Sequence, residues 1–599
     1  MSEAKYTVAQ YPIGSLISWV NDDTIAIPEI QRPFVWDATK VRNLLDSLYQ
    51  GYPIGYLIAW KNPNVRLKDG TYSEGKKILI DGQQRVTALM TAVLGRKVIT
   101  KDYRHTRICI AFNPVTETFE VSNPAIQKDQ EWIQDVGPII SGMANVFAAV
   151  DEYCGAMPSI ERSAVQNAVA KLSGIANSQI GMIELAANLD IETVTEIFIR
   201  INSAGVVLSQ ADFAMSKMAA NERYGGHTLR KAIDYFCHLA VAPEFYPTVA
   251  EVDREFSSTE YFKAMSWLKD ENDDLYDPSY TDMLRVAFTS QFGRGRFSDL
   301  VSLLSGRNFE TKEFEDSIAE ESFSKLSAGV MKFMNKTQFQ CYVMILRSAG
   351  FIDRSLVRSQ NVLNMGYILY LALRDAKVLQ PKIESLVRRW VVLSILTGRY
   401  SGSAESQFDF DIKRISSMDF SDYLAEIEQA ELSSAFWDAG LVQALNTSVA
   451  SSPLLNVFWA AQVKGNERGF LSRDITVDDM ISHHGDIHHI FPRAYMKKHG
   501  MKRGQYNQIA NFAYTQTEIN IAIGSKPPCE YMQYVRDSQC SGEKARYGGI
   551  DNTEDLMANL AANCIPESVF DMDADSYDTF LVERRKLMAA KIRDYYKGL

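Results

Sequence analysis

The chain has 599 residues, of which 46% are hydrophobic and 23% are charged, and its formal net charge is −11. This length exceeds what one hydrophobic core supports, so roughly three or four folding units are expected in an ordinary globular composition. With this negative net charge, the surface is not expected to be positive overall, so any contact with nucleic acid must use a local basic patch.

Targeting and redox features of the sequence predict a cytoplasmic protein. No run of about 18 apolar residues is present, so no membrane span is expected. The start, MSEAKYTVAQ, lacks the basic and apolar pattern of an export signal. The seven cysteines are scattered and form no CxxC pair, so reduced thiols are expected and a structural zinc knuckle is not.

The first 100 residues alternate helix and strand patterns. Asp37 can cap a helix that Gly51 ends. The apolar residues that recur there with the helical period are Val41, Leu44, Leu45 and Leu48. The expected strands cover residues 56–60, 77–80 and 107–112. A turn at Asp81-Gly82 leads from the second strand into a helix over residues 86–94, which indicates a small α/β or α+β domain.

Helical patterns dominate from about residue 159 onward. A helix is expected over residues 191–201, and Ser209 can cap the next one, with Asp212 at the capping-box position. Further long helices are expected over residues 362–373, 383–396 and 580–596. With a boundary near Gly465-Asn466, we expect a multidomain α+β chain. Its three domains would cover residues 1–225, 226–465 and 466–599.

The segment ILIDGQQR, residues 78–85, predicts a site for an anion. A strand there runs through a glycine turn into a helix, which leaves free backbone N–H groups and the positive helix end exposed. Arg85 adds a bidentate phosphate donor, and Gln83 and Gln84 can hydrogen-bond phosphate or ribose. The alternative is a turn with a surface arginine and no ligand. A short pattern of this kind, taken alone, more often indicates such a turn.

Four N-terminal segments resemble the N-terminal domain of GmrSD-type modification-dependent restriction enzymes: IPEIQRPFVW, GYPIGYLIAW, ILIDGQQRVTAL and EIFIRINSAGVVLSQADF. The DGQQR turn also resembles the phosphate-binding turn of ParB-like folds. The resemblance covers about residues 8–220 and implies a ParB-like domain that binds, and often hydrolyses, a nucleoside triphosphate such as GTP or ATP. It makes pocket candidates of Gln31, Arg32, Asp81, Gly82, Gln83, Gln84, Arg85 and Asn202. No Walker-type GxxxxGK[ST] motif is present, so an ordinary P-loop site is excluded.

Near the C-terminus, five of the eight histidines lie within seventeen residues, around the sequence DIHHIFP at residues 486–492. Imidazole is both a metal ligand and a base near neutral pH, so this pair indicates chemistry. Asn511 follows His489 by 22 residues, and Asn520 follows nine residues later. The intervening basic residues, which are candidates for DNA contact, are Arg493, Lys497, Lys498, Lys502 and Arg503. The alternatives are an incidental histidine pair and a solvated charged face.

This second constellation resembles the C-terminal HNH (ββα-metal) nuclease domain of the same enzymes, which are related to SspE- and BrxU-type phage-defence nucleases. The resemblance implies that His489 is the general base and that His488 and Asn520 are metal ligands. Asp486 is a weaker candidate ligand, and Asn511 would orient the loop or the base. Mg²⁺, Mn²⁺ or Ni²⁺ would suit such a site. Many HNH sites carry Asp-His in place of His488-His489.

Both constellations together predict a nucleotide-regulated, metal-dependent DNA endonuclease of anti-phage defence. Its partners would be DNA from phage, either modified or unmodified, and a nucleoside triphosphate, with a homodimer suited to double-strand breaks. Two alternatives stay open at this point. One is an RNA-cleaving, toxin-like nuclease, and the other is a nucleotide-gated DNA-binding module with weak nuclease activity.

Overall fold

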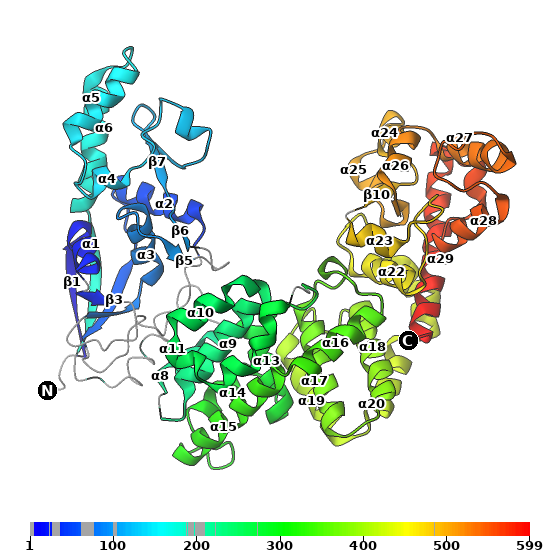
Figure 1. Cartoon of the computed structure of the whole chain (residues 1–599), viewed down its shortest axis with the longest axis horizontal. Helices are drawn as coiled ribbons and strands as arrows, with labels where there is room; N and C mark the ends of the chain where they lie inside the picture. The colour runs from blue at the N-terminus through cyan, green and yellow to red at the C-terminus, as the bar shows by residue number, and fades with distance from the viewer. Residues whose placement is uncertain are drawn as a thin grey trace. The chain divides into compact units, whose positions relative to one another are not determined.

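The computed structural model describes residues 5–22, 24–26, 36–61, 77–99, 105–186, 189, 197, 210–221, 223–271, 274–483 and 485–599. The chain forms two compact units, residues 1–227 and 228–599 (Figure 1). The architecture is mixed α+β, as the sequence predicts, and the further division near residue 465 stays a prediction. Within the described residues, no helix combines the length and apolar character needed to cross a membrane.

The first unit is built on a mixed five-stranded sheet. Its strands follow the spatial order β1 (Tyr6–Pro12), β9 (Gln179–Leu185), β3 (Tyr56–Lys61), β4 (Lys77–Asp81) and β2 (Ile25–Ala26). The central strand β3 runs parallel to β9 and antiparallel to β4. Three helices contribute buried apolar residues to the core on one face of this sheet: α1 (Ile13–Asn21), α2 (Ala38–Tyr49) and α3 (Gln83–Ala92). The turn between β4 and α3 is therefore fixed by the core of this unit.

Helix α2 forms for the reasons that its sequence predicts. The Asp37 side chain accepts a hydrogen bond of 2.8 Å from the backbone N–H of Lys40, which satisfies one of the free donors of the first turn. The apolar residues that recur with the helical period are all buried; they are Val41, Leu44, Leu45 and Leu48. The expected helix, its cap and its buried face are confirmed.

The remaining elements of the first unit are short strands and peripheral helices. They are β5 (Val98–Ile99), β6 (His105–Thr106), β7 (Ile110–Asn113), β8 (Thr118–Val121), α4 (Gly137–Ile140), α5 (Val146–Ala156), α6 (Arg162–Ser173) and α8 (Gln210–Ala220). The strand expected over residues 107–112 starts only at Ile110, because the backbone N–H of Ile108 donates to the Thr91 hydroxyl of α3 instead. Except for residue 197, the helix expected over residues 191–201 lies outside the described residues, as does the cap at Ser209.

Helices make up the first part of the second unit. They are α9 (Gly226–Val241), α10 (Tyr246–Val252), α11 (Arg254–Ser257), α12 (Glu260–Ala264), α13 (Tyr280–Phe292), α14 (Phe297–Leu304), α15 (Asp316–Phe333), α16 (Lys336–Ser348), α17 (Gln360–Asp375), α18 (Gln380–Thr397), α19 (Ala404–Ser417), α20 (Phe420–Glu431), α21 (Leu441–Ala444) and α22 (Pro453–Lys464). Helix α17 packs against both α13 and α18 (Figure 1). The long apolar helices expected over residues 362–373 and 383–396 are confirmed as α17 and α18.

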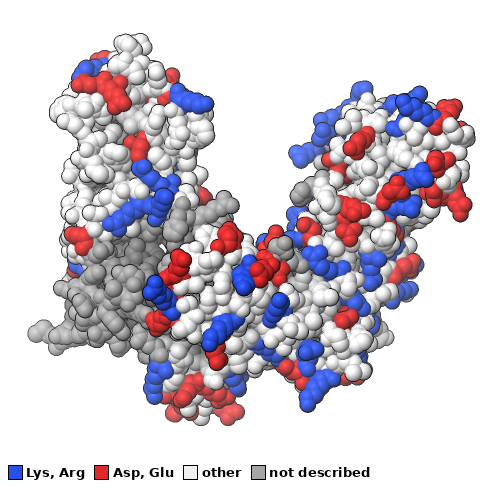
Figure 2. Space-filling view, viewed as in Figure 1, with Lys and Arg blue, Asp and Glu red and all other residues white. Residues whose placement is uncertain are grey.

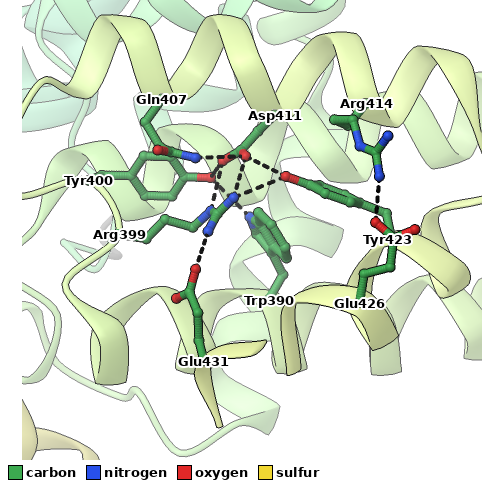
Figure 3. A network of polar contacts seen from close by, with 9 residues as sticks. All are labelled: Trp390, Arg399, Tyr400, Gln407, Asp411, Arg414, Tyr423, Glu426 and Glu431. Carbon is green, nitrogen blue, oxygen red and sulfur yellow. Dashed lines mark hydrogen bonds and ion pairs between the residues drawn. The ribbon is translucent and has the colours of Figure 1, made fainter. Parts of the chain in front are cut away.

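A buried polar network holds the end of α18 to α19 and α20 (Figure 3). The guanidinium of Arg399 donates to both carboxylate oxygens of Asp411, at 3.0 and 2.6 Å. The hydroxyls of Tyr400 and Tyr423 donate to the same carboxylate at 2.6 and 2.7 Å. Asp411 is fully buried, so these contacts replace its hydration. The segment Arg399-Tyr400 thus has a structural role that its sequence alone does not reveal.

Acid should weaken this helical part through His238 of α9. The ring is buried, 4.9 Å from the ring of Phe245, and burial lowers the pKa of His238 to about 4. As the pH falls from about 6.5 to 4, His238 becomes protonated in the unfolded chain but stays neutral in the folded chain. The free energy of unfolding should therefore fall by up to about 3 kcal/mol. Above this window the histidine is neutral in both states and contributes nothing.

Urea unfolding at pH 7 and at pH 4.5 checks this expectation. The loss of stability between the two pH values should be smaller in His238→Phe than in the wild type. His499→Phe, at an exposed position, serves as the control and should keep the wild-type loss. An equal loss in the wild type and in His238→Phe would contradict the assignment.

Candidate functional site

A short antiparallel hairpin followed by a helix brings the second constellation together. Strand β10 (Asp486–His489) pairs with β11 (Phe512–Thr515), and α26 (Thr517–Ile523) follows directly. In this register His488 lies opposite Ala513 and His489 lies opposite Phe512. The surrounding helices are α23 (Val477–Ser482), α24 (Arg493–Lys498), α25 (Arg503–Tyr506), α27 (Pro528–Gln533), α28 (Thr553–Ala562) and α29 (Tyr577–Lys597).

Three polar side chains from β10 and α26 meet on one side of the hairpin. The Nδ1 atom of His488 lies 2.7 Å from Oδ1 of Asn520. The Nδ2 atom of Asn520 donates to Oδ2 of Asp486 at 3.3 Å. His488 is almost completely buried, with its ring stacked on Phe470. Burial lowers the pKa of His488 to about 4, so the imidazole is neutral at physiological pH.

The donor set of these three side chains suits a divalent cation. Carboxylate and amide oxygens with one imidazole nitrogen are ligands for Mg²⁺ or Mn²⁺. Neighbouring ligand atoms of an octahedral ion with bonds of about 2.1 Å lie about 3 Å apart, which is close to the 2.7 Å between Nδ1 of His488 and Oδ1 of Asn520. In the described part of the chain, no cluster of three His, Cys, Asp or Glu has metal-binding spacing. A site at this hairpin would therefore take its third ligand from the amide oxygen of Asn520.

His489 occupies a different environment from its neighbour. Its Nε2 atom lies 2.9 Å from Oδ1 of Asn507, and its ring packs edge-on against Phe512 at 4.9 Å. Burial and, to a smaller extent, the positive charge of Arg493 lower the pKa of His489, while the hydrogen bond to Asn507 opposes this shift. An amide oxygen only accepts, so Nε2 carries the proton, and in the neutral ring Nδ1 keeps its lone pair.

Asn511 holds the loop between β10 and β11 rather than a histidine. Its Oδ1 atom accepts from the backbone N–H of Phe491 at 2.8 Å. Its Nδ2 atom donates to the carbonyls of Phe491 and Tyr506 at 3.1 and 3.0 Å. The side chain is fully buried, and both ends of its amide are used. Of the two expected roles for Asn511, the geometry favours the orientation of the loop.

The five basic residues near the hairpin lie on the surface of α24, α25 and the short link between them. Arg493, Lys497, Lys498, Lys502 and Arg503 are all exposed. Among the described residues none of them forms an ion pair with a carboxylate. Figure 2 shows Lys and Arg side chains gathered over this part of the second unit. A basic patch therefore exists beside the hairpin, although the whole chain is acidic.

The turn of the first unit has the backbone that the DGQQR sequence predicts. Gly82 caps α3 with φ = 90°, and a Cβ added there would lie 2.2 Å from the Leu57 side chain, so only glycine fits. Arg85 donates to the carbonyl of Ile54 at 2.9 Å and to Asp81 at 3.1 Å, which uses two of its five N–H donors. Gln83 is buried. Gln84 and Arg85 are half-buried, so both are more accessible than Gln83.

Several expected site residues fall outside the hairpin and the turn. Gln31, Arg32 and Asn202 lie outside the described residues. His483, one of the five clustered histidines, is exposed at the end of α23, where its Nδ1 atom lies 2.9 Å from the carbonyl of Asp479. Asn507 was missed, because nothing in the spacing of the sequence links it to His489.

Arg584 of α29 is a second residue that the sequence does not single out. It is fully buried and donates to the carbonyls of Ala510 and Asn563 at 2.8 and 3.1 Å. Burial lowers the pKa of Arg584 to about 10. The guanidinium thereby joins the C-terminal helix to the residue that precedes Asn511, which helps to hold the hairpin loop in place.

Two comparisons with known proteins bear on these sites. No curated protein matches the chain. The part that contains the five-stranded sheet and the DGQQR turn does match a known family. Residues 10–219 match the family model of the GmrSD restriction endonuclease, N-terminal domain, so this part of the chain is similar to that domain.

Proposed function

We propose that this protein is a nucleotide-regulated, metal-dependent DNA endonuclease of anti-phage defence. In this proposal the first unit is a ParB-like sensor that binds a nucleoside triphosphate, and the hairpin and helix α26 form an HNH-type nuclease centre. The observation that carries the proposal is the convergence of Asp486, His488 and Asn520 at the strand that also carries His489, in a chain whose N-terminal part matches a restriction endonuclease domain.

The residues of the hairpin have separate roles in the proposed hydrolysis of a phosphodiester. Asp486, His488 and Asn520 would hold a divalent cation, which offsets negative charge on the scissile phosphate when bound. His489 accepts a proton at Nδ1 from the attacking water, whose oxygen bonds to phosphorus as the bond to the leaving oxygen breaks. The leaving oxygen takes a proton from solvent. The buried wall around His488 keeps bulk water away from this side of the centre.

Cleavage assays with the purified full-length chain test this function. The substrates are unmodified and modified phage DNA and total RNA, each with Mg²⁺ or with a chelator, and with or without GTP or ATP. Metal-dependent cutting of DNA supports the proposal. Cutting of RNA alone would replace it with a toxin-like nuclease, and DNA binding without cutting under any condition would leave only a binding module.

The proposed nucleotide site predicts a loss of nucleotide affinity in Arg85→Ala. The first turn of α3 presents backbone N–H groups, and Arg85 lies where it can add charge to them. Isothermal titration with GTP and ATP should show an affinity at least about tenfold lower, since a charged hydrogen bond contributes about 1.5–3 kcal/mol. Arg96→Ala, also in the first unit, is the control. Equal affinity in the wild type and Arg85→Ala would remove this pocket.

The basic patch predicts a specific salt dependence. Lys497→Ala with Lys498→Ala should lower DNA affinity uniformly across sequences and reduce the slope of log affinity against log salt by about 2, because each phosphate contact releases one counterion. Fluorescence anisotropy over a salt series measures this slope. Lys336→Ala, an exposed change on α16, should leave it unaltered. A wild-type slope in the double variant would show that DNA binds elsewhere.

A further inference from the structure

The loop that joins β10 to β11 contributes a hydrogen bond to His489 that the proposed function does not explain. Asn507 follows the last turn of α25, and its Oδ1 atom lies 2.9 Å from Nε2 of His489. We propose that Asn507 is the positioning residue of the general base: it fixes the imidazole in the tautomer and rotation that present Nδ1 to the attacking water. This inference rests on the proposed nuclease function.

The chemistry of the two groups makes the contact directional. A neutral imidazole carries one proton, which can sit on either nitrogen. An amide oxygen accepts and cannot donate, so its position at Nε2 selects the tautomer whose free lone pair is on Nδ1. Without this partner the ring could populate the other tautomer or rotate by half a turn. In either case Nδ1 would no longer be the basic atom that faces the substrate.

Aromatic side chains restrict the plane of the His489 ring, but they do not determine which of its two nitrogens occupies which position. Phe512 contacts His489 edge-on at 4.9 Å, and the ring of Tyr506 lies at 6.2 Å. These contacts fix the plane of the imidazole, and they are equally compatible with a ring turned over. The hydrogen bond to Asn507 is therefore the contact that distinguishes the productive orientation.

Asn507 is itself held in place, as a positioning residue must be. Its backbone N–H donates to the carbonyl of Arg503 at 3.0 Å. The carbonyl of the preceding residue, Tyr506, accepts from Asn511 at 3.0 Å and from the hydroxyl of Tyr577 at 3.3 Å. The buried side chains of Asn511 and Tyr577 thus fix the backbone next to Asn507. The amide of Asn507 is therefore held in position for its hydrogen bond to the imidazole.

The neighbouring asparagine cannot take this role. Asn511 uses its oxygen on the N–H of Phe491 and its nitrogen on two backbone carbonyls, so its amide has no atom left for a ring. Gln508 offers a matched comparison, because it is an amide next to Asn507 whose nitrogen donates to the carbonyl of Gly504 in the same loop. The two amides allow the positioning role to be separated from general effects on the loop.

Steady-state cleavage of plasmid DNA with Mg²⁺ by the full-length chain tests the inference. In Asn507→Leu, kcat should fall about 100-fold, the scale on which a misoriented base loses its effect, while KM stays within about twofold. Asn507→Asp keeps an acceptor at the same place and should restore kcat to within about tenfold of the wild type. Gln508→Leu should cut as the wild type does. If Asn507→Leu fails to fold, Asn507→Ser, whose hydroxyl is too short to reach Nε2, should show the same loss of kcat.

Three outcomes would overturn the inference. The first is wild-type kcat in a folded Asn507→Leu or Asn507→Ser. The second is failure of Asn507→Asp to recover activity, and the third is a loss that appears in KM instead of kcat. Absence of cutting by the wild-type chain itself would reject the proposed function, and this inference with it. That result is distinguishable from a cutting wild type whose Asn507 variants cut equally well.

Discussion

Replacing His489 with Ala should reduce metal-dependent DNA cleavage by about 100- to 10,000-fold, the range that a general base contributes. The ring is the group whose Nδ1 lone pair is left available, because Nε2 is engaged by Asn507. The contacts among Asp486, His488 and Asn520 do not involve His489, so metal binding should persist. Rate measurements at saturating DNA, with calorimetric metal titration of the same variant, check both expectations.

A matched control distinguishes the loss of the general base from the general effect of removing a histidine. His499 belongs to the same cluster in the sequence, but it is exposed at the end of α24, with its Nδ1 atom 3.0 Å from the carbonyl of Tyr495. His499→Ala should therefore cut at the wild-type rate. Full cutting by a folded His489→Ala, or equal losses in the two variants, would defeat the assignment of His489.

The second large effect is expected in Asp411→Ala, on the stability of the helical part. Asp411 accepts from Arg399, Tyr400 and Tyr423 at its fully buried carboxylate. Its removal leaves the Arg399 guanidinium buried with Glu431 as its remaining carboxylate partner, at 2.8 Å. Breaking a buried ion pair from one side costs about 3–5 kcal/mol, and we expect a loss of unfolding free energy of this size. Urea unfolding followed by far-UV circular dichroism measures it.

The pair Arg414–Glu426 on the same helices is the control for this prediction (Figure 3). Its side chains are 39% and 54% exposed, so water already solvates both charges. Glu426→Gln should cost less than about 1 kcal/mol. A cost for Asp411→Ala as small as that of Glu426→Gln would show that the network contributes little to stability.

Local structure was the part of the fold that the sequence predicted well. The cap at Asp37 and the buried periodic residues of α2 depend on near neighbours in the chain, and the structure confirms both. The same holds for α17 and α18, whose apolar patterns are long enough to identify a helix. The strand expected from Arg107 was predicted less well, because a side chain from α3 takes the N–H of Ile108.

Contacts between residues far apart in the sequence were predictable only where the spacing of the residues matches that of a known structural motif. His488 and Asn520 are 32 residues apart and meet at 2.7 Å, as a strand-strand-helix order implies. Asn507, in contrast, reaches His489 only through the closure of a loop that Asn511 and Tyr577 hold. Arg85 is another such case, since its bond to Ile54 depends on how the sheet places two turns. These features follow from tertiary packing, which no local pattern specifies.

The central claim is that Asp486, His488 and Asn520 bind a divalent cation at the strand that carries His489. Crystals of the full-length chain soaked in Mn²⁺ test it most directly, because anomalous diffraction locates the ion. We expect a peak at bonding distance, about 2 Å, from side-chain atoms of both His488 and Asn520. A well-ordered hairpin without a peak there, or an ion bound only elsewhere, would contradict the account.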